Sequence, residues 1–400
     1  MTPLTQATIN STMADAAENL FGDDVYGAEG YGRNSTGILP SHVLRRLIKT
    51  RRQILSADSV HSPIEDHQIQ PASLDLRLGP VAYRVRASFL PGKDFTVDQK
   101  LSSVKMHEVH LDTDDGAVLE TGCVYVVPLL EKLELNRRVS GIANPKSSTG
   151  RLDVFTRLIT NNAQAFDRVE EGYSGPLFAE ITPRTFPVLV RKGSRLNQLR
   201  LRHGSPQFTD TDLRRLHELA PLTTGDADVE NGLAFSVDLR GNGNKLVGWR
   251  AKRHTGLIDI DKKDALRPED YWDPIFANSS GTLVLDPDEF YILASRERVA
   301  IPLDHAAEMV PFNPLVGEFR VHYAGFFDPG FGFEAGKPPS ARAVLEVRSR
   351  EVPFILEHGQ IVGRLVFERL TDPPPESYGQ GIGSNYQRQG LKLSKHFREP

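Results

Sequence analysis

The chain has 400 residues, of which 39% are hydrophobic and 25% charged, with a formal net charge of −4. A chain of this length is too long for one ordinary hydrophobic core, so we predict two domains. The acidic balance argues against broad nucleic-acid binding, and no apolar run is long enough to cross a bilayer. The single cysteine, Cys123, excludes an internal disulfide and a zinc site made of several cysteines. We therefore expect a cytoplasmic protein that meets any anion through a small cluster of cations.

The N-terminal segment, residues 1–38, is polar and rich in Gly, Asn, Ser and Asp. We predict a mobile arm here, because such a composition buries little apolar surface. A helix-like segment follows at residues 41–54, with Ser41 as its expected N-cap. A second one, at residues 211–220, stands before the second half of the chain.

Two halves of the sequence resemble one another. The pattern ASLDLRLG at residues 72–79 is echoed by FSVDLRGN at residues 235–242, with Asp75 and Asp238 163 positions apart. Farther along, six identities share an offset of 166: Tyr125/Tyr291, Glu131/Glu297, Pro145/Pro311, Glu180/Glu346, Pro187/Pro353 and Gly193/Gly359. These repeats predict two copies of one domain. The predicted layout is an arm at 1–38, a first domain at 39–204, a linker with a short helix at 205–228, a second domain at 229–370 and a tail at 371–400.

Both copies have the pattern of β structure. Short β-rich runs occupy residues 123–135 and 289–301, and apolar and polar residues alternate around glycine turns in 178–201 and 343–370. Short strands at this spacing favour a barrel or sandwich over a βαβ sheet. We therefore predict a mainly β protein with short helices.

The sequence KSSTGR, within residues 143–155, is a candidate anion site. Lys146 and Arg151 bracket three hydroxyl residues and Gly150, so the loop offers cationic, hydroxyl and backbone donors. It lacks the order of a P-loop and no parallel βα unit surrounds it. The composition alone is equally compatible with a polar turn at a strand edge.

Two strand glutamates, Glu180 and Glu346, are candidate acid/base groups. Strict alternation places Glu180 on the same face as Phe178. Burial on such a face would raise the pKa of a carboxyl, which suits proton transfer near neutral pH. The alternative is a strand glutamate that faces solvent in an ion pair.

The segments RVEEGYSG (168–175) and FDPGFG (327–332) each combine an acid, a glycine and an aromatic residue. Such a turn could hold a sugar hydroxyl and a ring, or it could be an ordinary hairpin turn. The histidines show no H-E-x-x-H pattern and no zinc deaminase signature, so zinc-hydroxide chemistry is unsupported.

In chain order, these motifs resemble the dCTP deaminase branch of the dUTPase/dCTP deaminase superfamily, in a long form with two fused copies. QPASLDLRLG resembles its early strand signature, and KSSTGR its triphosphate-binding R-S-S-x-x-R loop. RVEEGYSG resembles its R-x-D-P-G-[WF]-x-G hairpin, FAEI its strand with the catalytic glutamate, and SYGQGIGSNYQRQG its nucleotide-closing tail. The implied fold is a tandem duplication of a dUTPase-like distorted β-barrel, similar to a β-clip or jelly roll.

The resemblance implies hydrolytic deamination of dCTP to dUTP and ammonia, which feeds dUMP and dTTP synthesis. Glu180 would act as general base and acid on the attacking water, with Ser147 and Arg151 near the reacting base. The implied substrate contacts are Lys146, Ser148, Arg168, Glu170, Tyr173, Asp328, Tyr378 and Gln389. No catalytic metal is implied; Mg²⁺ would accompany the triphosphate. The resemblance also implies a homo-oligomer with sites at domain interfaces and inhibition by dTTP.

The sequence departs from the family pattern at several positions. Lys146 replaces an arginine, Glu170 an aspartate, and Asn385 a tail lysine. The second copy has VPFNPLVGEF (310–319) where the first has its loop, and therefore lacks the cations.

Two arrangements compete for the catalytic glutamate. Loops and Glu180 could both come from first copies, or first-copy loops could meet Asp328, Glu346 and the tail. A ring of three domains cannot alternate two domain types, which favours Glu180 and leaves Glu346 as the alternative.

Three other functions stay open at this point. The chain could be a dUTPase, or a bifunctional enzyme that makes dUMP from dCTP; the strand glutamates favour deamination over dUTP hydrolysis alone. It could also be a non-catalytic nucleotide sensor, since a fold does not fix a function.

Overall fold

The computed structural model describes residues 31–32, 34–205, 208–241, 245–311, 319–321, 325–349, 351–378, 381–382 and 389–399. Most of the predicted arm lies outside these ranges, but Tyr31 is buried and its ring stacks on His203 with centroids 4.6 Å apart. β1 (Gly37–Ile38) pairs with β14 (Asn197–His203). The predicted mobile arm is therefore wrong for the described residues from 31 to 38, because ring packing and strand pairing hold them.

The first half contains two main sheets built from short strands. Its further elements are α2 (Ser41–Lys49), β2 (Ile54–Ser56), the 3₁₀ helix η2 (Asp66–Gln68), β3 (Ile69–Gln70), β4 (Ser73–Leu76), β5 (Val81–Val85), α3 (Val97–Val104), β6 (Lys105–His110), β7 (Ala117–Leu119), β8 (Val124–Glu134), β9 (Val139–Pro145), α4 (Ser147–Gly150), β10 (Val154–Thr160), β11 (Arg168–Val169), β12 (Ser174–Pro183) and β13 (Val188–Val190). One sheet has the order β11-β9-β14-β4-β3 and the other β10-β12-β8-β5-β6.

The second half repeats this order after α5 (Asp210–Leu219), which lies in the predicted linker. Its elements are β15 (Leu233–Ser236), β16 (Leu246–Ala251), β17 (Ile258–Asp259), α6 (Pro268–Tyr271), β18 (Trp272–Phe276), β19 (Thr282–Leu285), β20 (Phe290–Val299), β21 (His305–Pro311), β22 (Phe319–Val321), β23 (Phe326–Phe327), β24 (Ala341–Ser349), β25 (Phe354–Glu357), β26 (Ile361–Arg369), β27 (Ser377–Tyr378) and β28 (Gly381–Ile382). The order β18-β16-β20-β24-β22 matches β6-β5-β8-β12-β10, and β21-β26-β15 matches β9-β14-β4. The predicted mainly β fold is confirmed.

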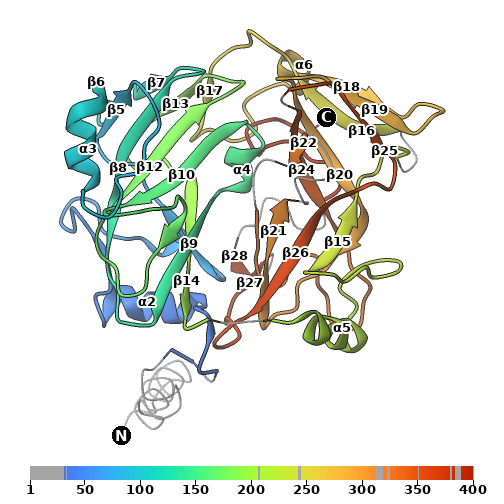
Figure 1. The fold of residues 1–400 in the computed structure, drawn as a ribbon, viewed down its shortest axis with the longest axis horizontal. Helices are drawn as coiled ribbons and strands as arrows, with labels where there is room; N and C mark the ends of the chain where they lie inside the picture. The colour runs from blue at the N-terminus through green and yellow to red at the C-terminus, as the bar shows by residue number, and fades with distance from the viewer. Residues whose placement is uncertain are drawn as a thin grey trace, which may run out of the picture.

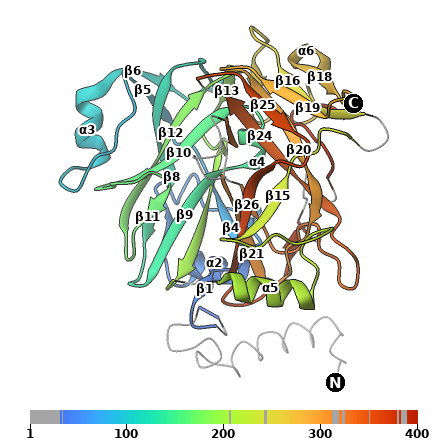
Figure 2. The ribbon, with the colours of Figure 1, turned by 45° about the vertical axis from the view of Figure 1, so that its right-hand side comes forward.

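The two copies differ in the segment between their first two long strands. In the first copy, residues 86–104 include α3 and cover one face of the β10-β12-β8 sheet, where a small core forms. In the second copy, residues 252–271 instead reach the first half, where β17 pairs in parallel with β13. Figures 1 and 2 show α3 at the outer edge of the first half, and α4 between the halves beside β24.

Buried ion pairs join the two halves. Arg200 is only 1% exposed and donates to the carbonyl oxygen of Ala307 at 3.1 Å and to Asp328 Oδ1 at 3.1 Å. Arg348 contacts Asp153 in the same way. Because both partners of each pair are buried, separating the halves would expose charges that the fold has already desolvated and paired.

Ser41 does not cap α2 as predicted. The N-cap is Pro40, and Ser41 Oγ donates instead to Glu376 Oε2 at 2.7 Å. Arg45 also contacts Glu376, at 2.9 Å, so α2 holds the segment that leads into the tail. In the described residues, no helix is long and apolar enough to span a membrane.

Candidate active site

The KSSTGR loop forms the short helix α4 at the junction of the two halves. Strand β9 ends at Pro145, and the backbone N–H of Lys146 donates to the carbonyl of Leu196 at 2.9 Å, which fixes the start of the helix. Ser147 is half-buried, whereas Ser148 and Arg151 are buried. The loop is therefore a largely buried helical turn between the two halves rather than a solvated turn.

Arg151 reaches across to the second copy. Its Nη1 donates to the carbonyl of Lys392 at 3.0 Å, and its Nη2 to Gln389 Oε1 at 2.9 Å. Its Nε lies 3.7 Å from Glu346 Oε1. The first-copy loop, the second-copy strand glutamate and the tail thus meet within one chain.

Glu346 has the electrostatics of a proton-transfer group. It lies on β24, opposite Ile292 of β20, and is only 4% exposed. Burial raises the pKa of its carboxyl from 4.5 to about 7, although Arg151 acts in the opposite direction. Near neutral pH, this carboxyl can therefore both accept and donate a proton.

Lys146 and Asp328 lie at the other end of the loop. Lys146 pairs with Asp75 of β4, and Arg195 Nη1 lies 3.5 Å from the same carboxylate. Asp328 is held by Arg200, and burial raises the pKa of its carboxyl. The second-copy hairpin is therefore held against β14 of the first copy.

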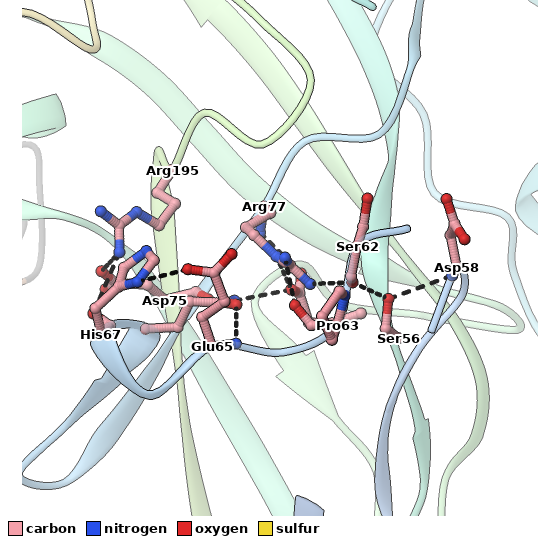
Figure 3. Close-up of polar contacts among 11 residues, drawn as sticks. Ser56, Asp58, Ser62, Pro63, Glu65, His67, Asp75, Arg77 and Arg195 are labelled. Atoms are coloured by element: carbon pink, nitrogen blue, oxygen red, sulfur yellow. Dashed lines mark hydrogen bonds and ion pairs between the residues drawn. The ribbon is translucent and has the colours of Figure 1, made fainter. Parts of the chain in front are cut away.

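Hydrogen bonds from Arg77 and Arg195 hold the segment around Asp75 in place (Figure 3). Arg77 donates from Nε to Glu131 Oε1 at 2.8 Å and from its Nη atoms to the carbonyls of Ser62 and Pro63. Arg195 donates to the carbonyl of His67 at 3.2 Å. These bonds fix the strand that carries Asp75.

The C-terminal residues, which we call the strap (residues 389–398), pack against α4. Gln389 Nε2 also donates to the carbonyl of Arg342 at 3.0 Å, and Ser394 Oγ donates to the carbonyl of Ser148 at 2.7 Å. Phe397 packs on Trp272, with ring centroids 6.0 Å apart. The strap thus ties the loop to the second copy.

Glu180 has a different environment. It lies opposite Arg157 in the β10–β12 pair and accepts from Arg157 Nη2 at 2.5 Å. The Arg157 guanidinium stacks on Phe166 at 3.5 Å, and Arg157 Nη2 also donates to Ser88 Oγ at 2.9 Å. Residues 86–104 cover this face, so Glu180 is buried inside its own domain.

The remaining predicted residues of the first copy lie apart from the loop. Strand β11, with Arg168, pairs with β9 at Ile142, and the turn at Gly172 bonds to Val139 at the start of β9. Because strands rise about 3.3 Å per residue, Arg168 is about 10 Å along β9 from Pro145, and the turn at Gly172 is about 20 Å from it. Glu170 is exposed, and Tyr173 donates to the carbonyl of Pro176 at 2.6 Å.

Some predicted features cannot be located. The side chain of Tyr378 lies outside the described residues, as does Asn385. The same holds for Phe312, Asn313 and Gly317, which correspond to Lys146, Ser147 and Arg151 at the offset of 166. In the part of the chain that the structure describes, no group of three or more His, Cys, Asp or Glu side chains could hold a metal ion.

Sequence reasoning missed Asp75 and Arg200 as members of the site. Asp75 lies in the S-x-D-L-R pattern that both copies share, so the repeat marked this residue, although the pattern served only to identify two domains. Arg200 is part of a β-rich run and carries no such signal. Its role depends on the contact between the halves.

Comparisons with known proteins match both halves of the chain to one family. The models of the N-terminal and C-terminal domains of 2'-deoxycytidine 5'-triphosphate deaminase match residues 35–205 and 209–397. The crystal structure of the deaminase of that name from Agrobacterium tumefaciens is 55% identical, with a TM-score of 0.79, and the match covers 84% of this chain and 99% of that chain.

Shorter relatives match over most of their own length. A "dCTP deaminase, dUMP-forming" of Mycolicibacterium gilvum is 33% identical over 196 residues, which is 48% of this chain and 96% of the relative. One of Methanothermobacter thermautotrophicus is 30% identical over 181 residues, 43% of this chain and 83% of the relative. The chain belongs to the dCTP deaminase family.

Proposed function

We propose that this chain deaminates dCTP to dUTP and ammonia at a site between its two copies, with Glu346 as the proton-transfer group. The observation that carries the proposal is the approach of Arg151 Nε to within 3.7 Å of the buried Glu346 carboxyl. A cationic loop for the triphosphate and a carboxyl with a pKa of about 7 are the two components that this reaction needs.

The proton transfers follow from this carboxyl. Ionised Glu346 takes a proton from a water whose oxygen bonds to C4 of the cytosine, and passes this proton to N3. Glu346 then takes the remaining proton from the C4 hydroxyl and passes it to the amino group; the C4–N4 bond breaks, ammonia leaves with that electron pair, and the C4=O double bond forms. The uracil keeps the water oxygen at C4, so atoms and charges balance.

The substrate contacts divide between the copies. Lys146, Ser147 and Ser148 would hold the triphosphate, which brings Mg²⁺ with it. Asp328, which Arg200 fixes in place, would contact the deoxyribose, and Gln389 would close the site through its bond to Arg151. Self-association and inhibition by dTTP stay predictions.

Glu180 is proposed to be structural. Its partner is Arg157 of its own sheet, and residues 86–104 cover the face from which a neighbouring loop would have to approach. The preference for Glu180 rested on three-domain symmetry. The two glutamates do not have equivalent surroundings. Residues 86–104 cover the sheet of the first copy, whereas the corresponding residues 252–271 of the second copy pair with β13 of the first copy.

A second candidate function is deamination followed by hydrolysis of dUTP to dUMP. The names of the Mycolicibacterium and Methanothermobacter relatives support it, whereas the name of the more similar Agrobacterium protein supports deamination alone. We propose the latter.

Ammonia and pyrophosphate should be measured with dCTP and then with dUTP as substrate. We expect ammonia from dCTP and no pyrophosphate from either. Pyrophosphate in step with ammonia would establish the dUMP-forming activity, and an absence of ammonia would overturn deamination.

A further inference from the structure

A second ion pair joins the two copies beside the contact between Arg151 and Glu346. Arg348 follows Glu346 by two positions on β24, and Asp153 follows Arg151 by two positions, just beyond α4. Arg348 Nη2 donates to the Asp153 carboxylate, and both side chains are buried. The first copy thus supplies the cation of one pair and the anion of the other. Because alternate residues of a strand share a face, Glu346 and Arg348 both point at the segment that ends α4.

Hydrogen bonds from both copies hold the pair of Asp153 and Arg348 in place. Thr185 Oγ1 donates to Asp153 Oδ2 at 2.6 Å and accepts from Arg348 Nη2 at 3.0 Å. Arg348 Nη1 donates to the carbonyl of Asp288, in the turn before β20. The guanidinium is therefore bonded through both of its Nη atoms, which fixes the place where β24 meets the first copy.

The backbone of Asp153 lies in a conformation that favours glycine. Its φ is +56°, in the left-handed region, where glycine has the lowest conformational cost. The residue belongs to the turn that ends α4, since its N–H donates to the carbonyl of Gly150 at 2.9 Å. What the aspartate adds to a turn that glycine could also make is the carboxylate that Arg348 contacts.

The sequence provides this ion pair beside one strand glutamate and not beside the other. At the offset of 166, Thr182 corresponds to Arg348, and Phe319 corresponds to Asp153. Neither threonine nor phenylalanine carries a charge, so these two positions cannot form an equivalent pair. The charged pair therefore accompanies only the glutamate that a loop of the other copy approaches.

We propose that the pair of Asp153 and Arg348 is a positioning device that sets the distance between Glu346 and Arg151. The inference rests on the proposed function and gives the pair a role that acts through its neighbours. Residues two apart on a strand are separated by about 6.6 Å, so a fixed contact at Arg348 limits how far Glu346 can move. Displacing a reacting group by about 1 Å can cost on the order of 100-fold in rate.

The test compares ammonia release from dCTP by Asp153→Gly and by the double variant Asp153→Gly with Arg348→Met, beside thermal denaturation. Glycine suits the left-handed backbone, so Asp153→Gly removes the carboxylate without adding strain. It leaves Arg348 buried without that partner and should lower the melting temperature, which the double variant should regain because it removes both charges. We expect kcat to fall about 30-fold in both variants. KM for dCTP should stay within about twofold of wild type, because the backbone bond that begins α4 at Lys146 is unchanged.

The matched control is Asn162→Gly, at the other end of β10. It also replaces a residue of positive φ, +62°, with glycine and removes a side-chain hydrogen bond, to the carbonyl of Lys93. It should change neither kcat nor KM. A double variant that regains wild-type kcat together with its melting temperature would overturn the inference, because the pair would then serve stability alone.

A measurement without turnover separates this inference from the proposed function. If the wild type releases no ammonia from dCTP, deamination fails, and denaturation at pH 8 decides whether the pair positions Glu346. Glu346→Gln should raise the melting temperature more in the double variant than in wild type, because the buried carboxylate that it removes there is farther from Arg151. An equal rise in the two backgrounds would show that the pair does not set this distance.

Discussion

Replacing Glu346 with glutamine should stabilise the protein at alkaline pH but not at acidic pH. The folded state binds a proton at Glu346 more tightly than the unfolded state does, because burial raises the pKa of this carboxyl from 4.5 to about 7. Wild-type stability therefore falls as the pH rises from about 4.5 to about 7. A shift of roughly 2.5 units corresponds to about 3 kcal/mol, which is fully lost above pH 7. Glutamine carries no charge, so the variant avoids this loss.

The assay is guanidinium denaturation of wild type and Glu346→Gln at pH 4.5 and pH 8. We expect the free energy of unfolding of the variant, relative to wild type, to be about 3 kcal/mol higher at pH 8 than at pH 4.5. Equal differences at the two pH values would show that the Glu346 carboxyl is not desolvated, and would refute the reasoning that makes it the proton-transfer group.

Three further substitutions test other contacts. Arg157→Gln should destabilise the protein by about 3 kcal/mol or more, because it leaves Glu180 buried without its guanidinium partner; thermal denaturation should show recovery in a double variant with Met at 157 and Leu at 180. Arg151→Lys should lower kcat/KM for dCTP by about 100-fold, since lysine cannot reproduce the fork that reaches Gln389, and steady-state rates within twofold of wild type would contradict this. Phe397→Ala should remove about 3 kcal/mol of stability and raise KM for dCTP, as measured by denaturation and initial rates, whereas an unchanged KM would separate strap docking from substrate binding.

The fold could be predicted largely because the duplication repeats its signals. Offsets of 163 and 166 residues aligned the two copies, and alternation identified runs that form β8, β12, β20 and β24. Each strand has one face in a core, so its period of two is visible in the sequence. The packing of Tyr31 could not be predicted from the sequence, because a single aromatic residue in a polar segment gives no repeating pattern.

The catalytic glutamate could not be chosen from the sequence. Glu180 and Glu346 occupy equivalent strands with similar neighbours, and the difference between them arises from the segments 86–104 and 252–271. The first covers its own sheet, whereas the second pairs with β13 of the other copy, and Arg151 of the first copy lies against Glu346 instead. No local pattern states which way an inserted segment folds, because the choice depends on surfaces far away in sequence.

The most direct test of the account is ammonia release from dCTP by Glu346→Gln and Glu180→Gln, with calorimetry to confirm that both bind dCTP. Loss of the proton-transfer group should lower kcat by about 10³-fold in Glu346→Gln, while Glu180→Gln should keep kcat within about threefold per folded molecule. Full activity in Glu346→Gln together with its loss in Glu180→Gln would contradict the account.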